Sequence, residues 1–359
     1  MSAETMQKGS SRLASVDALR GLAVAAMLLV NNPGDWGHVY APLEHAAWHG
    51  CTPTDLIFPF FLFIVGVSLA LSLGPRIEAD APRAPLARLV LERALRIFGL
   101  GLALHLLAWW LMDKPEFRLL GVLQRIGLCF ALGGLALLYC RARVRWLLLA
   151  ALAGLHAALL LGAGALDKAG SLQARLDTAL LGRWAYEWDG RHAFDPEGVL
   201  STLGALATCL LGLAAGQLLR RGQLVRLALL AAAGLALGQA LTPWLPLNKQ
   251  LWTGSFVLWT GGWASLALWL GHQLIDRRGW PALGRSFGVN AIAAYAGAWI
   301  CTVLLEGFGW MAPLYARGFG WLEPLVGPYG RSLAFALVFV GVWWVIVRVL
   351  DARRIYIKV

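Results

Sequence analysis

The sequence predicts an all-α, polytopic membrane protein with about ten transmembrane helices. Hydrophobic residues make up 59% of the 359 positions, whereas charged residues make up only 14%. Apolar runs of about 20 residues, long enough to cross a bilayer, recur along the chain. Within lipid every backbone group must be paired inside the protein, and no alternating pattern suggests a β-barrel. We therefore expect helices, in one transmembrane domain over residues 1–359.

The first predicted span follows Lys8 and Arg12 and could pass for a signal peptide. We expect it to be retained, because it leads directly into a polar loop without a convincing small-residue cleavage site. No internal repeat of the kind found in many transporters is visible. The predicted spans are 16–30, 56–73, 89–111, 119–140, 146–161, 199–219, 224–241, 251–270, 287–305 and 332–350.

Basic residues are distributed unequally between the two sides that alternating spans define. The amino terminus, the loops after even-numbered spans with the adjoining span ends, and the tail carry 21 of the 31 Lys and Arg residues. Cytoplasmic loops carry the positive excess in membrane proteins. We therefore expect both termini in the cytoplasm and the loops at about 31–55, 162–198 and 306–331 outside. The net charge of +11 reflects this bias, and no nucleic-acid partner is expected.

The predicted outer loop 31–55 is where we expect chemistry. It holds three of the seven histidines, and no Lys or Arg occurs between Arg20 and Arg76. Imidazole titrates near neutral pH and suits general acid–base catalysis. His45 is therefore the leading candidate for the catalytic residue. The alternative is an interfacial histidine that makes a single hydrogen bond.

The neighbours of His45 support the catalytic interpretation. Asn31 and Asn32 end the first span and Asp55 starts the second, so all three open onto the same surface as the histidine. A metal site is the rival interpretation, because His45 and His49 would share a helix face and a third histidine lies nearby. The loop has no HExxH motif and is rich in Pro and Gly, so we expect no metal.

Two polar residues lie within the fourth predicted span. Gln124 and Arg125 are about two turns from its outer end, roughly 9 Å deep. A guanidinium at that depth needs an anion, either a protein carboxylate or a ligand phosphate. Asp17 and Arg20 in the first span are either functional or a simple i, i+3 ion pair.

Polar motifs also precede the sixth and eighth spans. In FDPEG, Asp195 as N-cap, Pro196 at the first position and Glu197 in the first turn predict a helix start. Glu197 could instead be a substrate ligand. In PLNKQLWTGS, Asn248 and Lys249 are capping and snorkelling residues or substrate ligands.

A phosphate-binding end is predicted on the cytoplasmic side. LGRSFGVNAIAAY places Arg285, Ser286 and Asn290 at a helix amino terminus, which favours a phosphate-bearing ligand, although ordinary capping explains these residues equally well. Arg93 and Arg96 in the third span are further candidates for the same end.

These motifs together resemble the heparan-α-glucosaminide N-acetyltransferase family, including its bacterial members. The resemblance is carried by SVDALRGLAVAAMLLVNNPGDW, EHAAWHGCTPTDLIFPFFLFIVGVS, GVLQRIGLCFAL, FDPEGVLSTLGA, LNKQLWTGSFVLWTGG and GVNAIAAY, which span nearly the whole chain. It implies a multi-pass enzyme of the cell inner membrane that moves the acetyl group of cytosolic acetyl-CoA to a sugar amine on the far side. The family's essential histidine falls on His45 and its asparagine on Asn31. We expect the extra-membrane domain of animal members to be absent here, so their glycosaminoglycan acceptor is not carried over.

Two chemical routes follow from this resemblance. His45 either takes the proton of the attacking amine directly or is itself acetylated and passes the group on; we favour direct transfer. The alternative functions are a membrane transporter or flippase for a sugar or glycan, and an O-acetyltransferase of a surface glycan. A homodimer is compatible with the sequence. The expected catalytic residues are His45, Asn31 and Asp55. The residues expected to bind acetyl-CoA are Arg125, Gln124, Arg93, Arg96, Arg285, Ser286 and Asn290. The residues expected to bind the acceptor sugar are Asn32, Trp48, Glu197, Asn248 and Lys249.

Overall fold

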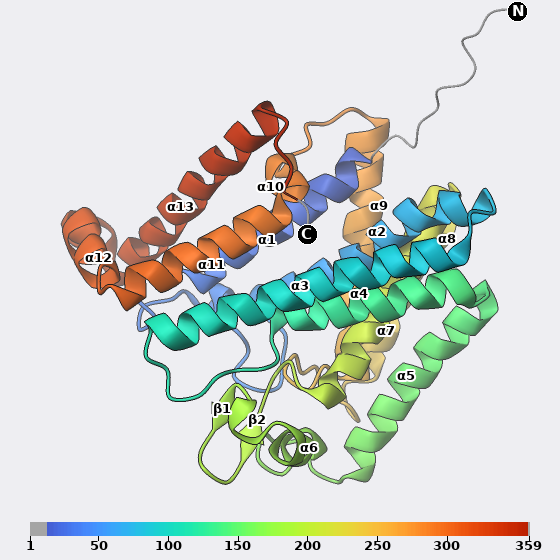
Figure 1. Cartoon of the computed structure of the whole chain (residues 1–359), viewed down its shortest axis with the longest axis horizontal. Helices are drawn as coiled ribbons and strands as arrows, with labels where there is room; N and C mark the ends of the chain where they lie inside the picture. Colours follow the sequence, from blue (N-terminus) through green and yellow to red (C-terminus); the bar gives the residue numbers. More distant parts are fainter. Residues whose placement is uncertain (1–12, 358–359) are drawn as a thin grey trace, which may run out of the picture.

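The computed structural model describes residues 13–357, which form a bundle of long helices (Figure 1). Lys8, Arg12 and Lys358, which entered the charge count, lie outside the described residues. Each predicted span overlaps one long helix. These helices are α1 (Ala14–Asn31), α2 (Ile57–Glu78), α3 (Arg83–Leu111), α4 (Val122–Tyr139), α5 (Ala142–Gly162), α7 (Val199–Arg220), α8 (Leu224–Ala240), α9 (Gly254–Gly271), α11 (Ala291–Gly307) and α13 (Glu323–Ala352).

The structure is nearly all-α, with an apolar character that fits a membrane protein. Seven helices within residues 13–357 are long and apolar enough to cross a membrane, and α8 and α11 are shorter apolar helices. The exact number of ten spans and the cytoplasmic placement of the termini stay predictions.

Smaller elements lie between the long helices. In the predicted outer segment 162–198, α6 (Leu172–Leu180) precedes a hairpin in which β1 (Glu187–Trp188) pairs antiparallel with β2 (Ala193–Phe194). The predicted helix start at FDPEG is wrong, because α7 begins after this motif with Gly198 as its N-cap. The other short α-helices of the described residues are α10 (Arg285–Val289) and α12 (Met311–Phe319).

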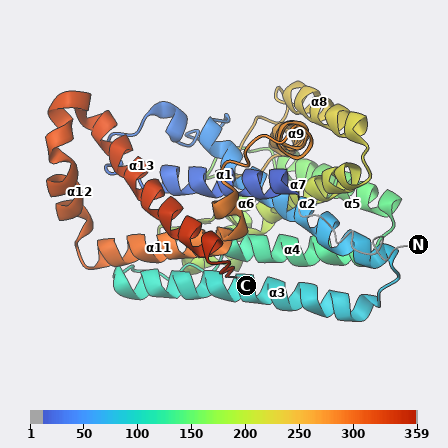
Figure 2. The ribbon, with the colours of Figure 1, turned by 90° about the horizontal axis from the view of Figure 1, so that it is seen from above.

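The centre of the bundle depends on close helix approach. Figure 2 shows α1, α2 and α7 between a layer of α3 with α4 and a layer of α8 with α9. A Cβ at Gly66 of α2 would lie only 1.9 Å from the carbonyl oxygen of Cys209 of α7, and one at Gly212 only 2.0 Å from that of Phe63. Glycine at these two positions lets the backbones touch, as small residues do between membrane helices.

The ion pair predicted as one alternative for the first span is present. Arg20 Nη1 lies 3.1 Å from Asp17 Oδ1 and also donates to the carbonyl of Gly288, while Nη2 donates to Ser68 Oγ at 2.8 Å. These contacts join α1 to α2 and α10.

Four loops that the alternation of the spans assigns to the predicted outer side contact one another. Trp48 Nε1 donates to the carbonyl of Leu166 at 2.8 Å, and Asn248 Nδ2 donates to the carbonyl of Trp48 at 2.9 Å. The N–H of Leu119 donates to the carbonyl of Trp184 at 2.9 Å. The loops that follow α1, α3, α5 and α8 therefore form one layer, in which the candidate site lies.

Candidate functional site

A histidine and a buried aspartate form the first part of the site. His45 Nδ1 lies 2.7 Å from Asp55 Oδ1. Asp55 Oδ2 accepts the N–H groups of Ala46 and Thr52, both at 3.0 Å, in a capping box at the short turn Pro53–Leu56. The Asp55 side chain is 1% exposed and that of His45 48%. An ionised carboxylate only accepts hydrogen bonds. Nδ1 of His45 therefore carries the ring proton, and the basic lone pair lies on Nε2.

Lys249 approaches the same imidazole from the loop between α8 and α9. Its Nζ lies 2.9 Å from His45 Nε2 and 3.1 Å from Nδ1. The neighbouring Asn248 fixes this loop, because its Oδ1 accepts the N–H of Leu251 at 2.7 Å and its Nδ2 reaches the loop that carries His45. Burial lowers the pKa of Lys249, although the nearby carboxylates of Asp55 and Glu197 oppose this shift.

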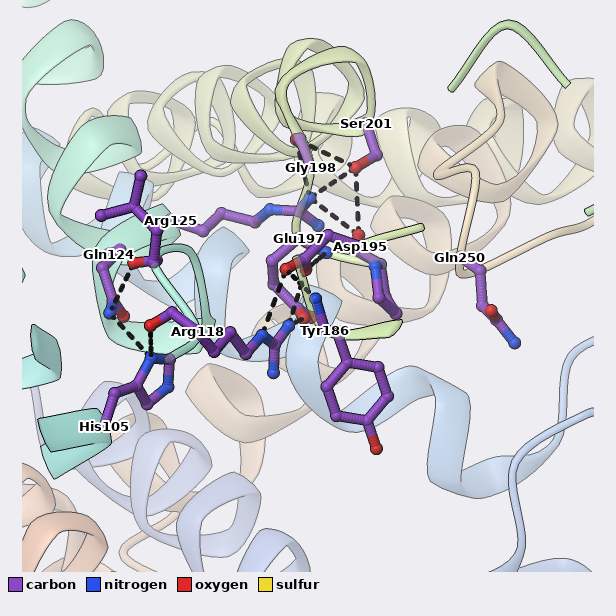
Figure 3. Close-up of polar contacts among 12 residues, drawn as sticks. His105, Arg118, Gln124, Arg125, Tyr186, Asp195, Glu197, Gly198, Ser201 and Gln250 are labelled. Atoms are coloured by element: carbon purple, nitrogen blue, oxygen red, sulfur yellow. Dashed lines mark hydrogen bonds and ion pairs between the residues drawn. The ribbon is translucent and has the colours of Figure 1, made fainter. Parts of the chain in front are cut away.

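Arg118 forms the second part of the site with two carboxylates (Figure 3). Its Nη2 lies 2.7 Å from Asp195 Oδ1 and 2.5 Å from Glu197 Oε2, and its Nε lies 3.2 Å from Asp195 Oδ2. Both acids are buried. Burial raises the pKa of Asp195. For Glu197, burial is the largest single effect and would raise the pKa, but Arg118, Arg125 and Lys249 together outweigh it and lower the pKa.

Among the described residues, the hydrogen-bond partners of Arg125 are neutral oxygens rather than a carboxylate. Its Nη2 donates to the carbonyls of Pro196 and Gly198 at 2.8 and 3.3 Å and to Ser201 Oγ at 2.5 Å. The guanidinium also lies 5.1 Å from the ring centroid of Trp252. Arg125 thereby positions the segment that leads into α7, which places both acids against Arg118.

Gln124 and a histidine that the sequence did not single out support the Arg118 loop. Gln124 Nε2 donates to the carbonyl of Leu119 at 3.2 Å, and His105 Nδ1 lies 2.8 Å from the carbonyl oxygen of Arg118. Sequence reasoning missed Arg118 and His105 as site residues and took Asp195 for a helix cap. The available signal was one arginine in a short loop on the same predicted side as two acids.

Two predicted residues at the end of α1 behave differently. Asn31 is exposed, and no hydrogen bond joins it to His45 in the described part of the chain. Asn32 is buried, with Nδ2 donating to the carbonyl of Leu28 at 2.7 Å and Oδ1 accepting from Thr302 Oγ1 at 2.6 Å. Asn32 therefore ties α1 to α11. Trp48, also predicted to bind the acceptor, packs on the Phe194 ring at 5.7 Å between centroids.

The predicted phosphate-binding residues are divided between two places. Arg285 Nη1 pairs with Asp351 Oδ2 at 2.7 Å, and Ser286 Oγ donates to the same oxygen at 3.2 Å. Asn290 Oδ1 accepts the N–H of Ile357 at 3.3 Å. These contacts join α10 to the end of α13, so a phosphate at Arg285 would compete with a carboxylate.

Arg93 and Arg96 are exposed on α3. The Arg93 guanidinium lies 5.2 Å from the ring centroid of Phe130 on α4. Within residues 13–357 neither arginine forms an ion pair.

The other two histidines of the loop are not gathered around His45. His38 Nδ1 pairs with Asp35 Oδ2 at 2.7 Å, and His49 Nδ1 lies 3.4 Å from Asn248 Nδ2. Over the described residues, no group of three or more His, Cys, Asp or Glu side chains could hold a metal ion.

A hollow of about 470 Å³ lies beside the site, over α6 and the hairpin. It shares Phe194 with the wall that Trp48 packs against, but His45 does not line it. The lining side chains are Lys168, Ala169, Ala174, Arg175, Thr178, Glu187, Trp188, Asp189, His192, Ala193 and Phe194.

Asp177 of α6 makes stability depend on pH. It accepts the N–H of Asp195 at 2.9 Å, and burial raises its pKa from an ordinary 3.8 to about 7. The folded state thus binds an extra proton between these values, so stability is highest at low pH and falls, by at most ~1.4 kcal/mol per pH unit, as pH rises toward 7. We expect Asp177→Asn to match the wild type below the ordinary pKa of 3.8 and to exceed it increasingly as pH rises toward 7. Thermal unfolding in detergent at several pH values checks this, and parallel curves would contradict it.

Comparison with known proteins gives one consistent result. A family model described as "Heparan-alpha-glucosaminide N-acetyltransferase, catalytic" matches residues 12–274. The heparan-alpha-glucosaminide N-acetyltransferase of Homo sapiens is 28% identical over 355 residues, covering 80% of this chain and 52% of that protein. The Mus musculus protein of the same name is 27% identical over 367 residues, covering 82% and 54%. The chain spans about half the length of these curated relatives, and the matched region contains both parts of the site.

Proposed function

Because the chain belongs to the heparan-alpha-glucosaminide N-acetyltransferase family, we propose that it is an acetyl-CoA-dependent N-acetyltransferase acting on the amine of a sugar. The printed names of the relatives supply the reaction type and the glucosaminide acceptor class. The observation that carries the proposal is the pairing of a solvent-accessible imidazole with a buried carboxylate, His45 with Asp55 at 2.7 Å.

His45 is proposed to act as the general base. Asp55 holds Nδ1–H, so Nε2 takes the proton from the sugar amine as the nitrogen attacks the thioester carbonyl carbon. The carboxylate also stabilises the imidazolium that forms, and the proton then passes to the departing thiolate of CoA. Direct transfer is favoured over an acetyl-histidine, since an exposed acyl-imidazole would be open to water. Asn31, at the end of α1, is proposed to donate to the developing oxyanion.

The donor is proposed to enter from the cytoplasm. Pantetheine is long and flexible, and the hydrocarbon layer it has to cross is about 30 Å thick. Arg93 and Arg96, which form no ion pair in the described residues, are the candidates for the CoA phosphates, whereas Arg285 would first have to leave Asp351. The acceptor would bind at the loop layer, on the periplasmic side of the cell inner membrane, with Glu197 and Lys249 close to it. The positive-inside bias supports this sidedness.

Release of the CoA thiol from acetyl-CoA tests the proposed function. Purified protein in detergent is expected to release thiol when glucosamine is added, and to release little with N-acetylglucosamine, whose nitrogen is already blocked. The two sugars offer the same hydroxyl groups, so the difference isolates the amine. Equal release with both would indicate O-acetylation. Absence of release with either, together with sugar uptake into proteoliposomes, would indicate a transporter instead.

A further inference from the structure

Lys249 presents a primary amine to the nitrogen that the proposed mechanism uses as its base. Its Nζ lies 2.9 Å from His45 Nε2, while Asp55 holds Nδ1. A sugar acceptor has to bring its own amine to this place, because an attacking nitrogen must lie within hydrogen-bond reach of the base. Lys249 therefore occupies the position of the acceptor's amine.

The surroundings of Lys249 favour a reactive amine. Its backbone is anchored through Asn248, so the side chain is held at the imidazole rather than free in solvent. Among the described residues it forms no ion pair with a carboxylate. The charged and titratable groups that influence it are, besides His45, Asp55, Glu197, Arg125 and Cys51; burial is the largest effect and lowers the pKa of Lys249. A larger share of neutral, nucleophilic amine at neutral pH follows than for an exposed lysine.

We propose that Lys249 is itself an acetylation site, and that without a bound acceptor the protein transfers the acetyl group of acetyl-CoA to Lys249 Nζ. This inference rests on the proposed function, since it needs a thioester delivered to His45. The acetylated side chain would be neutral and would cover Nε2. The modified protein is therefore expected to be inactive toward sugars, and a bound sugar is expected to protect Lys249.

The step is balanced without any further reactant. The Lys249 ammonium first loses one proton to solvent. The neutral amine then forms a bond to the thioester carbonyl carbon, and the carbon–sulfur bond breaks with its electron pair on sulfur. His45 Nε2 takes the second proton from the nitrogen and passes it to the thiolate. The products are an amide on Lys249, the CoA thiol and one released proton, and nothing is oxidised or reduced.

Incubation of the purified full-length protein with isotope-labelled acetyl-CoA, without sugar, followed by peptide mass spectrometry, tests the proposal. Lys249 is expected to be labelled about 10²-fold faster than the exposed Lys114, the size of a general-base effect. Lys168, which pairs with Glu187, is a second reference. In His45→Ala, Lys249 should be labelled no faster than Lys114, and glucosamine should suppress labelling in the wild type. If His45→Ala does not fold, Asp55→Asn retains the imidazole and should also slow the labelling.

The outcomes separate this inference from the proposed function. Equal labelling of Lys249 and Lys114, or labelling of Lys249 that persists in His45→Ala, overturns self-acetylation. Release of CoA thiol with glucosamine is measured in the same samples. Sugar-dependent release without labelling of Lys249 overturns self-acetylation and leaves the proposed function standing. Labelling without sugar-dependent release supports self-acetylation and removes the amino sugar as acceptor. Absence of both Lys249 labelling and sugar-dependent thiol release overturns self-acetylation and the proposed function alike.

Discussion

Replacing His45 with Ala is expected to lower the rate of acetyl transfer by about 10²–10⁴-fold while the protein stays folded. The imidazole is half exposed, so its removal leaves no large cavity. Asp55 still accepts hydrogen bonds from the N–H groups of Ala46 and Thr52 in this variant, so the loop retains its shape. What is lost is the group that takes the proton from the amine. The measurement is the rate of CoA thiol release with saturating glucosamine, alongside the elution profile in detergent.

His38 supplies a matched control on the same loop. It also pairs with an aspartate at 2.7 Å, but Asp35 is 41% exposed whereas Asp55 is 1% exposed. We expect His38→Ala to transfer acetyl groups at nearly the wild-type rate. A near-normal rate in His45→Ala, or the same loss in both variants, would remove His45 from the mechanism.

Replacing Arg118 with Met is expected to destabilise the protein by about 3–5 kcal/mol, because it leaves two buried carboxylates without their cation. Asp195 and Glu197 both contact the guanidinium, and neither can reach water without moving the segment that leads into α7. The measurement is the thermal unfolding midpoint in detergent. Acetyl transfer should also fall, because Glu197 of this segment acts electrostatically on Lys249.

Arg88 supplies the control for this prediction. It pairs with Glu92 one turn away on α3, but the two side chains are 81% and 41% exposed. Such a surface pair contributes only about 0.3–0.5 kcal/mol, so Arg88→Met should hardly move the midpoint. Adding Asp195→Asn and Glu197→Gln to Arg118→Met should recover part of the loss by removing the buried charges. A shift for Arg118→Met no larger than that for Arg88→Met would contradict the prediction.

Features that depend on neighbouring residues were predictable from the sequence. A helix in lipid satisfies its backbone internally, so a local run of apolar residues is enough to predict it, and each predicted span overlaps a helix. His45 and Asp55 are only ten residues apart, on one polar loop, and the structure brings them together. Local patterns also have limits: Asp195 fits a helix cap by sequence, but its partner Arg118 is 77 residues away.

The sequence by itself determined the helical membrane class, the approximate spans and the loop that carries His45, because apolar length and local polarity specify them. Only the tertiary structure decided which loops meet. Lys249 lies 204 residues from His45 in the chain, and Asn32 lies 270 residues from Thr302. Such contacts depend on how the helices are ordered in the bundle, and hydropathy carries no information on that order. The residues that surround the imidazole are therefore a consequence of packing, not of local pattern.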